Sequence, residues 1–222
     1  MGMSVALVVI LLSCLIINGV LVISADPDPI NDYCIADPTI KNSFINGLPC
    51  KNPATVTSAD FHSSLFKAAP DTSNPLGIAL GFVAGATFPA LNTQGLTLVK
   101  IDYAKSGGFV PPHVHPRASE IIYVIAGEVE VGLIDTSGKF FNATLFPGDL
   151  FVFPRGLIHY QSSVPSCTSL SLSALNSQNP GLSLVASALF GSTPGIPDSI
   201  LAKTFSITPA QVEDIKKAFG GH

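Results

Sequence analysis

A succession of short apolar segments separated by glycine and proline turns most constrains how this chain can fold. Between residues 78 and 174 these segments are only a few residues long, and no strand–helix–strand rhythm or long internal repeat interrupts them. Short strands at regular spacing with Gly or Pro turns indicate an all-β barrel or sandwich. We expect strands at 78–83, 96–103, 120–126, 128–135, 139–146, 150–153, 157–161 and 167–174.

Beyond the strand region the pattern becomes helical. Short helical segments are expected at 182–190 and 197–205. Thr208 and Gln211 then mark a further helix start, with threonine as N-cap, proline at the first helical position and glutamine placed as in a capping box. The apolar side chains of this last helix fall on one face: Val212, Ile215 and Phe219. Gly220 is expected to end the helix. Helices with little of their own domain to cover often pack on a neighbouring subunit, so this arm favours an oligomer.

Three histidines and one glutamate stand out within the strand-rich region. His113 and His115 flank a single residue, and alternate residues of a strand point to the same face, so both imidazoles can converge on one ion. Glu120 begins the next extended run, and His159 lies on a later one. Three neutral nitrogens and one anionic oxygen suit Mn, Fe or Zn and leave coordination positions for water or substrate. We therefore predict a metal centre at His113, His115, Glu120 and His159.

Structural roles are the alternative for each of these side chains. A single histidine in a strand is more often structural than a ligand, and His62 and His222 are interpreted in that way. Glu120 could be a surface ion-pair partner, but the apolar residues at 121–124 predict that it is buried, where an unpaired carboxylate would be costly. The turn residues at 154–156 would deliver His159 at a defined angle, which favours the metal centre.

Charge and the first residues bear on partners and location. The formal net charge of −4, without any run of like charges, gives no electrostatic basis for binding nucleic acid.

Residues 5–23 are almost continuously apolar, and no charged side chain precedes Asp26. We predict a secretory signal peptide at 1–24, cleaved after Ser24 or Ala25, which leaves a mature chain without a membrane segment. The alternative is an uncleaved membrane anchor, because the apolar run approaches the length of a bilayer span.

Secretion changes how the cysteines are interpreted. Cys14 would leave with the signal peptide, and the oxidising secretory route would allow Cys34 and Cys50 to pair, with a stabilisation of about 3 kcal/mol from closing the intervening loop. Cys167 lies beside alternating serines and leucines and is interpreted as a buried, unreactive thiol rather than one that pairs between chains. Asn142 begins an Asn-Ala-Thr sequon and is the predicted glycosylation site.

At these residues the chain resembles the cupin superfamily, and in particular the plant germins and germin-like proteins. The stretches that carry the resemblance are DPDPINDYCIAD, PPHVHPRASEI, FPGDLFVFPRGLIHYQ and NSQNPG. It implies a cupin jelly-roll β-barrel with a C-terminal α-helical arm. The single domain at 25–222 would comprise a disulfide-pinned arm at 25–75, a barrel at about 76–175 and the helical arm at about 180–220.

The resemblance also implies a cofactor, a bridge and an assembly. A manganese ion would be held by His113, His115, Glu120 and His159. Cys34 would be bonded to Cys50. Members of the family are typically secreted to the apoplast and assemble as hexamers built as trimers of dimers.

Two departures from the family pattern bear on activity. Germins that oxidise oxalate carry two asparagines in the pocket, at the positions that Val99 and Val110 occupy here. A site built around hydrogen bonds to a dicarboxylate loses orders of magnitude when those partners are apolar. Ser163 stands where the second motif usually closes with asparagine, and we expect this change to alter a local hydrogen bond rather than the metal site.

Three functions follow as alternatives. The first is an extracellular manganese superoxide dismutase with a role in extracellular redox or plant defence, because superoxide is small and needs only an open coordination position on a metal that can cycle. The second is oxidation of oxalate or another small carboxylate, against which Val99 and Val110 count. The third is a secreted binding, receptor-like or wall-associated protein in which the metal is structural.

Overall fold

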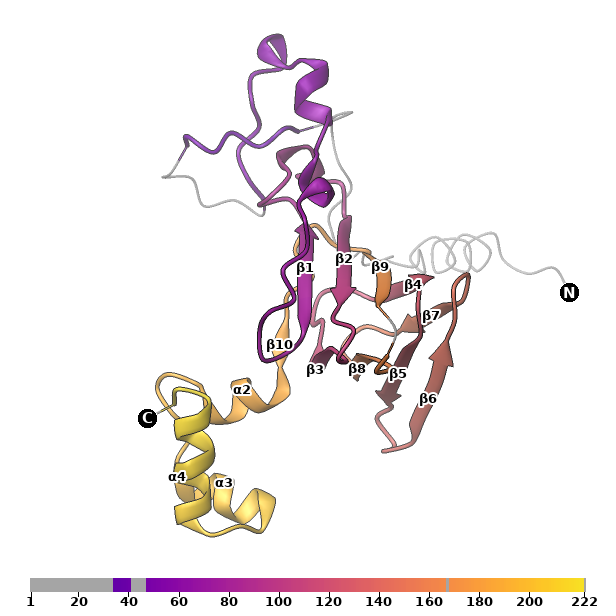
Figure 1. Ribbon diagram of the computed structural model, residues 1–222. Coiled ribbons are helices and arrows are strands. Elements are labelled where there is room, and N and C mark those ends of the chain that lie inside the picture. The colour runs from indigo at the N-terminus through magenta and orange to yellow at the C-terminus, as the bar shows by residue number, and fades with distance from the viewer. Residues whose placement is uncertain (1–33, 41–46, 167, 222) are drawn as a thin grey trace, which may run out of the picture.

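Two five-stranded antiparallel sheets form the barrel of the protein, in a computed structural model that describes residues 34–40, 47–166 and 168–221 (Figure 1). The predicted signal peptide at 1–24, Cys167 and His222 lie outside the described residues. In chain order the strands are β1 (Ile78–Val83), β2 (Thr97–Tyr103), β3 (Phe109–Val114), β4 (Glu120–Ala126), β5 (Val129–Ile134), β6 (Phe140–Leu145), β7 (Leu150–Phe153), β8 (Ile158–Ser163), β9 (Ser169–Leu175) and β10 (Ser183–Leu184). One sheet has the order β1-β2-β9-β4-β7 and the other the order β10-β3-β8-β5-β6. The predicted all-β jelly-roll barrel with a C-terminal helical arm is confirmed.

Alternate residues of each strand face the interior, as a strand's period of two requires. In β4, Ile122 and Val124 are fully buried, whereas Ile121 and Tyr123, which alternate with them, are 39% and 41% exposed. The core draws on both sheets and consists mainly of β-branched and aromatic side chains: Ile78, Val99, Ile101, Tyr103, Val110, Ile122, Val124, Val129, Val131, Phe153 and Leu175. This interior holds the strands that carry the predicted metal ligands.

Most of the predicted strands match those in the structure. The segments 78–83, 120–126 and 150–153 coincide with β1, β4 and β7, and the other predicted strands differ at their ends by one or two residues. The predicted helix at 182–190 is wrong at its start, because Ser183 and Leu184 form β10 and pair with Val114 and His113 of β3. The free edge of β3 offers backbone hydrogen bonds that outweigh the local helical preference of these residues.

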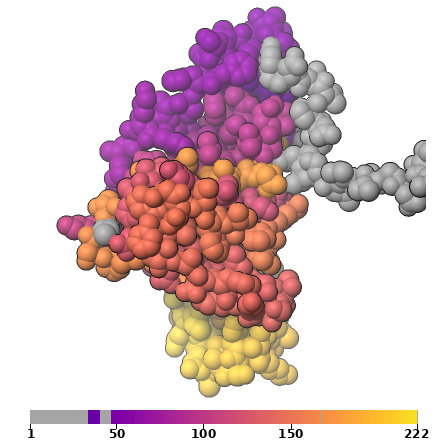
Figure 2. Space-filling view, turned by 90° about the vertical axis from the view of Figure 1, so that its right-hand side faces the viewer, coloured from indigo at the N-terminus to yellow at the C-terminus, as the bar shows by residue number. Residues whose placement is uncertain are grey.

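Three helices follow the barrel and form an arm that extends from it (Figures 1 and 2): α2 (Val185–Phe190), α3 (Asp198–Phe205) and α4 (Pro209–Ala218). Their shared core contains Phe190, Leu201 and Val212. Within the described part of the chain, none of the helices combines the length and the apolarity needed to span a bilayer.

Both predicted ends of α4 are confirmed. The Thr208 hydroxyl accepts from the Gln211 backbone N–H, and the Gln211 side chain accepts from the Thr208 N–H, which is a capping box. Gly220 has a φ of +70°, and the N–H of Gly221 donates to the carbonyl of Lys216, as in a glycine-terminated helix. Of the predicted apolar face, Val212 is fully buried, whereas Phe219 remains 43% exposed.

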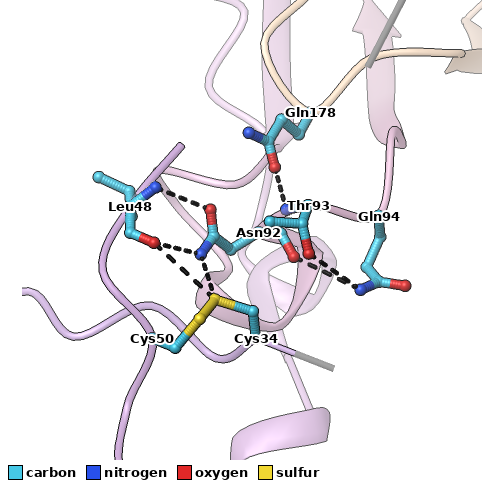
Figure 3. Close-up of a disulfide and its surroundings, with 7 residues drawn as sticks. All are labelled: Cys34, Leu48, Cys50, Asn92, Thr93, Gln94 and Gln178. Atoms are coloured by element: carbon cyan, nitrogen blue, oxygen red, sulfur yellow. Dashed lines mark hydrogen bonds between the residues drawn. A yellow bond between two sulfur atoms is a disulfide. The ribbon is translucent and has the colours of Figure 1, made fainter. Parts of the chain in front are cut away.

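The N-terminal segment is fastened by a disulfide bond between Cys34 and Cys50, which confirms the predicted pairing (Figure 3). The Asn92 side chain bonds both backbone groups of Leu48, donating to its carbonyl at 2.7 Å and accepting from its N–H at 3.0 Å. Asn92 lies between β1 and β2, so these bonds join the segment to the barrel. Short 3₁₀ helices complete this region: η1 (Pro53–Thr55), η2 (Ser58–Phe61), η3 (Leu65–Lys67) and η4 (Pro89–Leu91).

Truncation of Ile122 tests whether the interior of β4 is close-packed. We expect Ile122→Val to lower the free energy of unfolding by about 0.5–1.5 kcal/mol and Ile122→Ala to lower it by about 2–5 kcal/mol, since the larger truncation leaves a cavity between the sheets. Denaturant unfolding of the two variants and the parent protein measures the difference. Equal and small effects of both substitutions would contradict the packing described here.

Candidate metal centre

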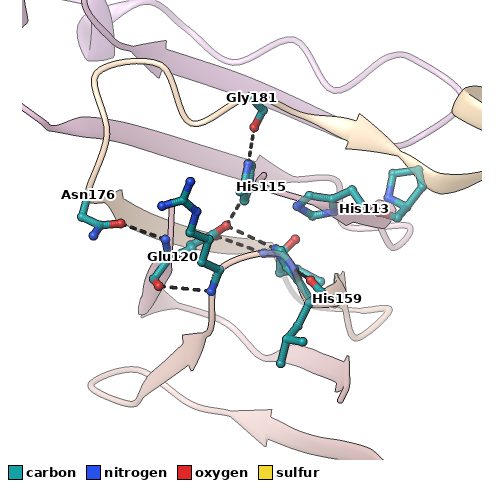
Figure 4. A network of polar contacts seen from close by, with 11 residues as sticks. His113, His115, Glu120, His159, Asn176 and Gly181 are labelled. Atoms are coloured by element: carbon teal, nitrogen blue, oxygen red, sulfur yellow. Dashed lines mark hydrogen bonds and ion pairs between the residues drawn. The ribbon is translucent and has the colours of Figure 1, made fainter. Parts of the chain in front are cut away.

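Four buried side chains from different parts of the barrel meet at one point (Figure 4). His113 lies on β3, His159 on β8, Glu120 begins β4, and His115 follows the end of β3. The candidate ligand atoms of these four residues all lie within 4.8 Å of one another. The side chains that sequence analysis selected are therefore brought together, although they come from both sheets.

The two histidines of the His-Val-His motif reach this point in different ways. His113 is paired directly with His159 across β3 and β8, and their ring centroids are 4.1 Å apart. The prediction that His115 also lies on the strand is wrong, because β3 ends at Val114. His115 nevertheless turns inward, with its ring centroid 5.0 Å from that of His113.

Backbone carbonyl groups fix the orientation of all three imidazoles. The Nδ1 atoms of His113 and His159 each lie 2.8 Å from a carbonyl oxygen two residues earlier, on Pro111 and Leu157. The Nδ1 atom of His115 lies 2.5 Å from the carbonyl oxygen of Gly181. A carbonyl oxygen can only accept, so each Nδ1 carries the proton and each Nε2 presents its lone pair. This is the arrangement in which histidine binds a metal ion.

The contacts of Glu120 call for a cation at the centre. Its Oε2 atom lies 2.9 Å from Nε2 of His115 and 3.4 Å from Nε2 of His159. A carboxylate oxygen and an imidazole lone pair approach this closely only when a proton or a metal ion lies between them. The donor set therefore fits a metal cation, which would replace repulsion between lone pairs with coordination.

The pKa values of the centre are set by burial and by these contacts. Burial, with the nearby charge of His159, lowers the pKa of His113 to about 4. Burial alone would raise the pKa of Glu120, but the hydrogen bonds that His115 and His159 donate to it when their Nε2 atoms also carry a proton hold this pKa well below its usual range. For His115, burial acts to lower the pKa, and the bonds to Glu120 and Gly181 outweigh it, so the pKa is raised. At neutral pH the centre thus combines an ionised carboxylate with a neutral His113, as coordination of a divalent cation requires.

Two neighbours that sequence analysis missed support the ligands. The Gln161 amide is buried and donates from Nε2 to Oε1 of Glu120 at 3.1 Å. The Phe153 ring stacks on His159, with centroids 4.3 Å apart and an angle of 17° between the planes. Gln161 lies two residues after His159 on β8, so the strand's period of two was a usable signal for it. Phe153 gave no comparable signal, because its contact depends on how the two sheets pack.

The loops around the centre are joined to one another. The Ser119 backbone N–H donates to the Asn176 side chain at 2.8 Å, and the Ser119 hydroxyl accepts from the Arg155 backbone N–H at 3.1 Å (Figure 4). Arg117 donates to the Asn179 carbonyl at 2.6 Å. The NSQNPG stretch thereby holds the loops that carry His115 and Glu120.

The residues that depart from the family pattern lie in the barrel. Val99 and Val110 belong to its buried core, and Val110 is opposite Gln161 in the pairing of β3 with β8. The Ser163 hydroxyl is buried and accepts from the Gly108 backbone N–H at 2.8 Å. This hydrogen bond joins the end of β8 to the residue before β3 and involves none of the candidate ligands. His62 and Asn142 are exposed and lie outside the centre.

Comparisons with known proteins bear on this centre. The family model described as "Cupin" matches residues 63–213. The chain is similar to germin-like protein subfamily 2 member 1 of Arabidopsis thaliana, with 44% identity over 196 residues that cover 88% of this chain and 89% of that protein. It is also similar to germin-like protein 1-3 of Oryza sativa subsp. japonica, with 41% identity over 199 residues and 89% of each chain covered. Among solved structures, an oxalate oxidase aligns with a TM-score of 0.83 and 38% identity, over 87% of this chain and 98% of that chain.

Removal of one imidazole tests the centre as a metal site. We expect the parent protein to retain about one divalent metal ion per chain after dialysis, and His113→Ala to retain almost none, because three donors remain around a buried carboxylate. A metal ion at a concentration about a thousand times its Kd stabilises the folded protein by about 4 kcal/mol. Removal of the ion by chelation should therefore lower the midpoint of thermal unfolding of the parent protein by about 10 °C. Elemental analysis and scanning calorimetry measure these quantities.

The exposed His62 provides the matched control. His62→Ala removes an imidazole outside the centre, so it should leave both the metal content and the chelation-dependent shift unchanged. Equal metal retention by His113→Ala and the parent protein would contradict a metal centre at these residues.

Proposed function

Since this chain belongs to the germin-like proteins of the cupin family, we propose that it is a secreted manganese-binding protein with superoxide dismutase activity. The observation that carries the proposal is the buried meeting point of His113, His115, His159 and Glu120, whose ligand atoms lie within 4.8 Å of one another. The histidines are held there by backbone carbonyls with their Nε2 lone pairs free.

Manganese suits a donor set of three imidazoles and one carboxylate. Mn²⁺ stands low in the affinity order of divalent metals, so its supply in the secretory route would decide loading more than the ligands do. When bound, the ion would supply the one-electron oxidation and reduction by which two superoxide anions and two protons give dioxygen and hydrogen peroxide.

The residues of this chain would hold and orient the metal ligands, and they would not need to form a binding site shaped to a larger substrate. Gln161 orients the Glu120 carboxylate, and the backbone carbonyls keep the imidazoles in one tautomer. Val99 and Val110 line the buried interior without hydrogen-bonding groups. A diatomic anion needs no such groups, whereas a dicarboxylate does, which favours superoxide as the substrate.

Dismutation by the purified protein tests this function. We expect activity in proportion to the manganese content, and a loss of at least about a hundredfold in His113→Ala, because the metal-dependent route is removed. Elemental analysis and a superoxide assay on the same samples measure both quantities, with His62→Ala as the control that keeps its activity. Full activity in metal-free His113→Ala would rule the proposal out.

Oxalate oxidation is the second candidate, because the chain is 38% identical to an oxalate oxidase of solved structure. The buried side chains of Val99 and Val110 count against it, as they cannot hydrogen-bond a dicarboxylate. We expect the holoprotein to release no hydrogen peroxide when oxalate is added, and we expect the double variant Val99→Asn/Val110→Asn to gain oxalate-dependent peroxide release. A peroxide assay on both proteins checks this, and rapid release by the parent protein would favour the second candidate.

A non-enzymatic role is the third alternative, in which the metal only stabilises the fold. It predicts that chelation lowers thermal stability while no turnover is lost, because none is present. The superoxide and peroxide assays on the same metal-loaded sample distinguish it from the two enzymatic functions. The fold is compatible with such a role as a binding, receptor-like or cell-wall protein.

Secretion to the apoplast is supported by the Cys34–Cys50 disulfide, since disulfides form and persist in oxidising compartments. The mature chain of the secreted protein should begin at Ala25 or Asp26, which N-terminal sequencing would measure.

Asn142 lies exposed on β6, as a glycosylation site must. A glycosidase-sensitive mass that is lost in Asn142→Gln would establish the glycan.

A homohexamer, built as a trimer of dimers, is supported by exposed apolar side chains on the outer face of the β1-β2-β9-β4-β7 sheet: Leu98, Ile121, Tyr123, Ile125, Leu150 and Val152. A broad exposed apolar face of this kind marks an interaction surface. The helical arm, which extends from the barrel in Figure 1, offers a second means of contact. Light scattering would measure the mass of the assembly.

A further inference from the structure

The only two arginines of the chain both lie in loops beside the candidate metal centre. Arg117 is two residues after His115, and Arg155 is four residues before His159. Both side chains belong to exposed residues, whereas all four candidate ligands are buried. Two permanent positive charges at the protein surface thus lie in the loops next to the candidate ligands.

Hydrogen bonds hold both guanidinium groups in place. Arg117 donates from Nε to the Asn179 carbonyl at 2.6 Å and from Nη2 to the Asn179 side-chain oxygen at 3.0 Å. Arg155 donates from Nε to the Pro116 carbonyl at 2.9 Å. These acceptors are neutral, so the bonds orient the two groups without cancelling their charge.

Neither arginine is paired with a carboxylate in the described part of the chain. The three surrounding segments, 115–119, 154–157 and 176–181, contain no aspartate or glutamate. The nearest acidic side chain in the sequence is Glu120, which is buried and directed at the histidines.

His115 connects the arginines to the centre. It is the most exposed of the four candidate ligands, at 7%, and its Nδ1 is bonded to the carbonyl of Gly181. A side chain added at Gly181 would come within 2.9 Å of the Arg117 Nη2 atom, so the guanidinium lies against the residue that orients His115. Arg155 is bonded to the carbonyl of Pro116, the neighbour of His115 in sequence.

We propose that Arg117 and Arg155 form a cationic rim that draws small anions to the metal centre. This inference rests on the proposed function, in which the anion is superoxide. The chain as a whole carries a net charge of −4 and would repel an anion. Fixed charges of one sign beside an opening focus the local field and raise the association rate of an oppositely charged substrate.

The salt dependence of the reaction tests the rim. We measure the second-order rate constant for superoxide between about 0.01 M and about 0.15 M salt, over which the Debye length falls from about 30 Å to about 8 Å. The parent rate should fall as salt is added. Arg117→Gln and Arg155→Gln should each lower the low-salt rate roughly two- to fivefold, and the double variant about tenfold. In the double variant the rate should stay level or rise with salt, because the net negative charge then dominates.

Two sets of variants separate the charge from the hydrogen bonds. Arg117→Lys and Arg155→Lys keep the charge but lose the bonds that the planar guanidinium makes. If the charge is what matters, as in a cationic rim, both lysine variants should react at nearly the parental rate. If the arginines have only a structural role, the lysine variants should lose as much rate as the glutamine variants. Lys203→Gln makes the same change of charge on α3 in the helical arm and should leave the rate unaffected. Metal content is measured for every variant. A parental rate that is insensitive to salt, or an equal loss in Lys203→Gln, would overturn the proposal.

Equilibrium binding of an inert anion gives a readout that does not require turnover. Fluoride affinity of the manganese-loaded protein, followed by paramagnetic resonance or calorimetry, should fall roughly two- to fivefold in each glutamine variant at low salt and be retained in the lysine variants. If the protein does not dismutate superoxide but fluoride affinity changes in this way, the proposed function is refuted and the cationic rim is supported. If the protein does dismutate superoxide, but the variants keep the parental fluoride affinity and the rate does not depend on salt, only the rim is refuted.

Discussion

The hydrogen bond from each imidazole to a backbone carbonyl is the constraint on which the rest of the centre depends. It fixes the proton at Nδ1 and leaves Nε2 as a donor toward the common point. For His113 and His159 the carbonyl lies two residues earlier, on Pro111 of β3 and on Leu157 just before β8, so the same chain segment supplies it. For His115 the partner is Gly181, which belongs to a distant segment. The centre is therefore complete only when that segment is docked.

The docked segment also begins the C-terminal arm, which couples the arm to the centre. Immediately after Gly181, Ser183 and Leu184 pair with Val114 and His113 of β3. The same few residues thus orient one candidate ligand, extend the strand that carries another, and lead into α2. Conversely, a metal ion that holds His113 and His115 would stabilise the edge on which the arm is anchored. In the proposed hexamer, contacts between subunits through the arm would therefore be linked to occupancy of the centre by this short piece of backbone.

Sequence analysis succeeded where structure follows local periodicity. The apolar residues that follow Glu120 predicted the extent of β4 and the burial of Glu120 correctly, and the capping residues Thr208 and Gln211 placed the start of α4. The four candidate ligands were found because their residue types are rare in this chain and their spacing fits strands. It failed where a distant partner decides the outcome. β10 exists because β3 has a free edge, and the contact between Gln161 and Glu120 joins β8 to β4 across the two sheets. Neither the partner strand nor the opposing sheet is visible in a local pattern.

The interior around the centre limits the chemistry more than the ligands do. Val110 and Val131 flank Gln161 in the pairing of β8 with its neighbours, and the amide N–H of Gln161 is already committed to Glu120. Val99 is buried as well, so the positions at which the resemblance to oxalate-oxidising germins implies contact with a dicarboxylate carry apolar side chains. Superoxide, the substrate proposed above, would need no such hydrogen-bonding groups. Under the proposed function, the side chains around the ligands, rather than the ligands themselves, would therefore decide between a small anion and a dicarboxylate as the substrate.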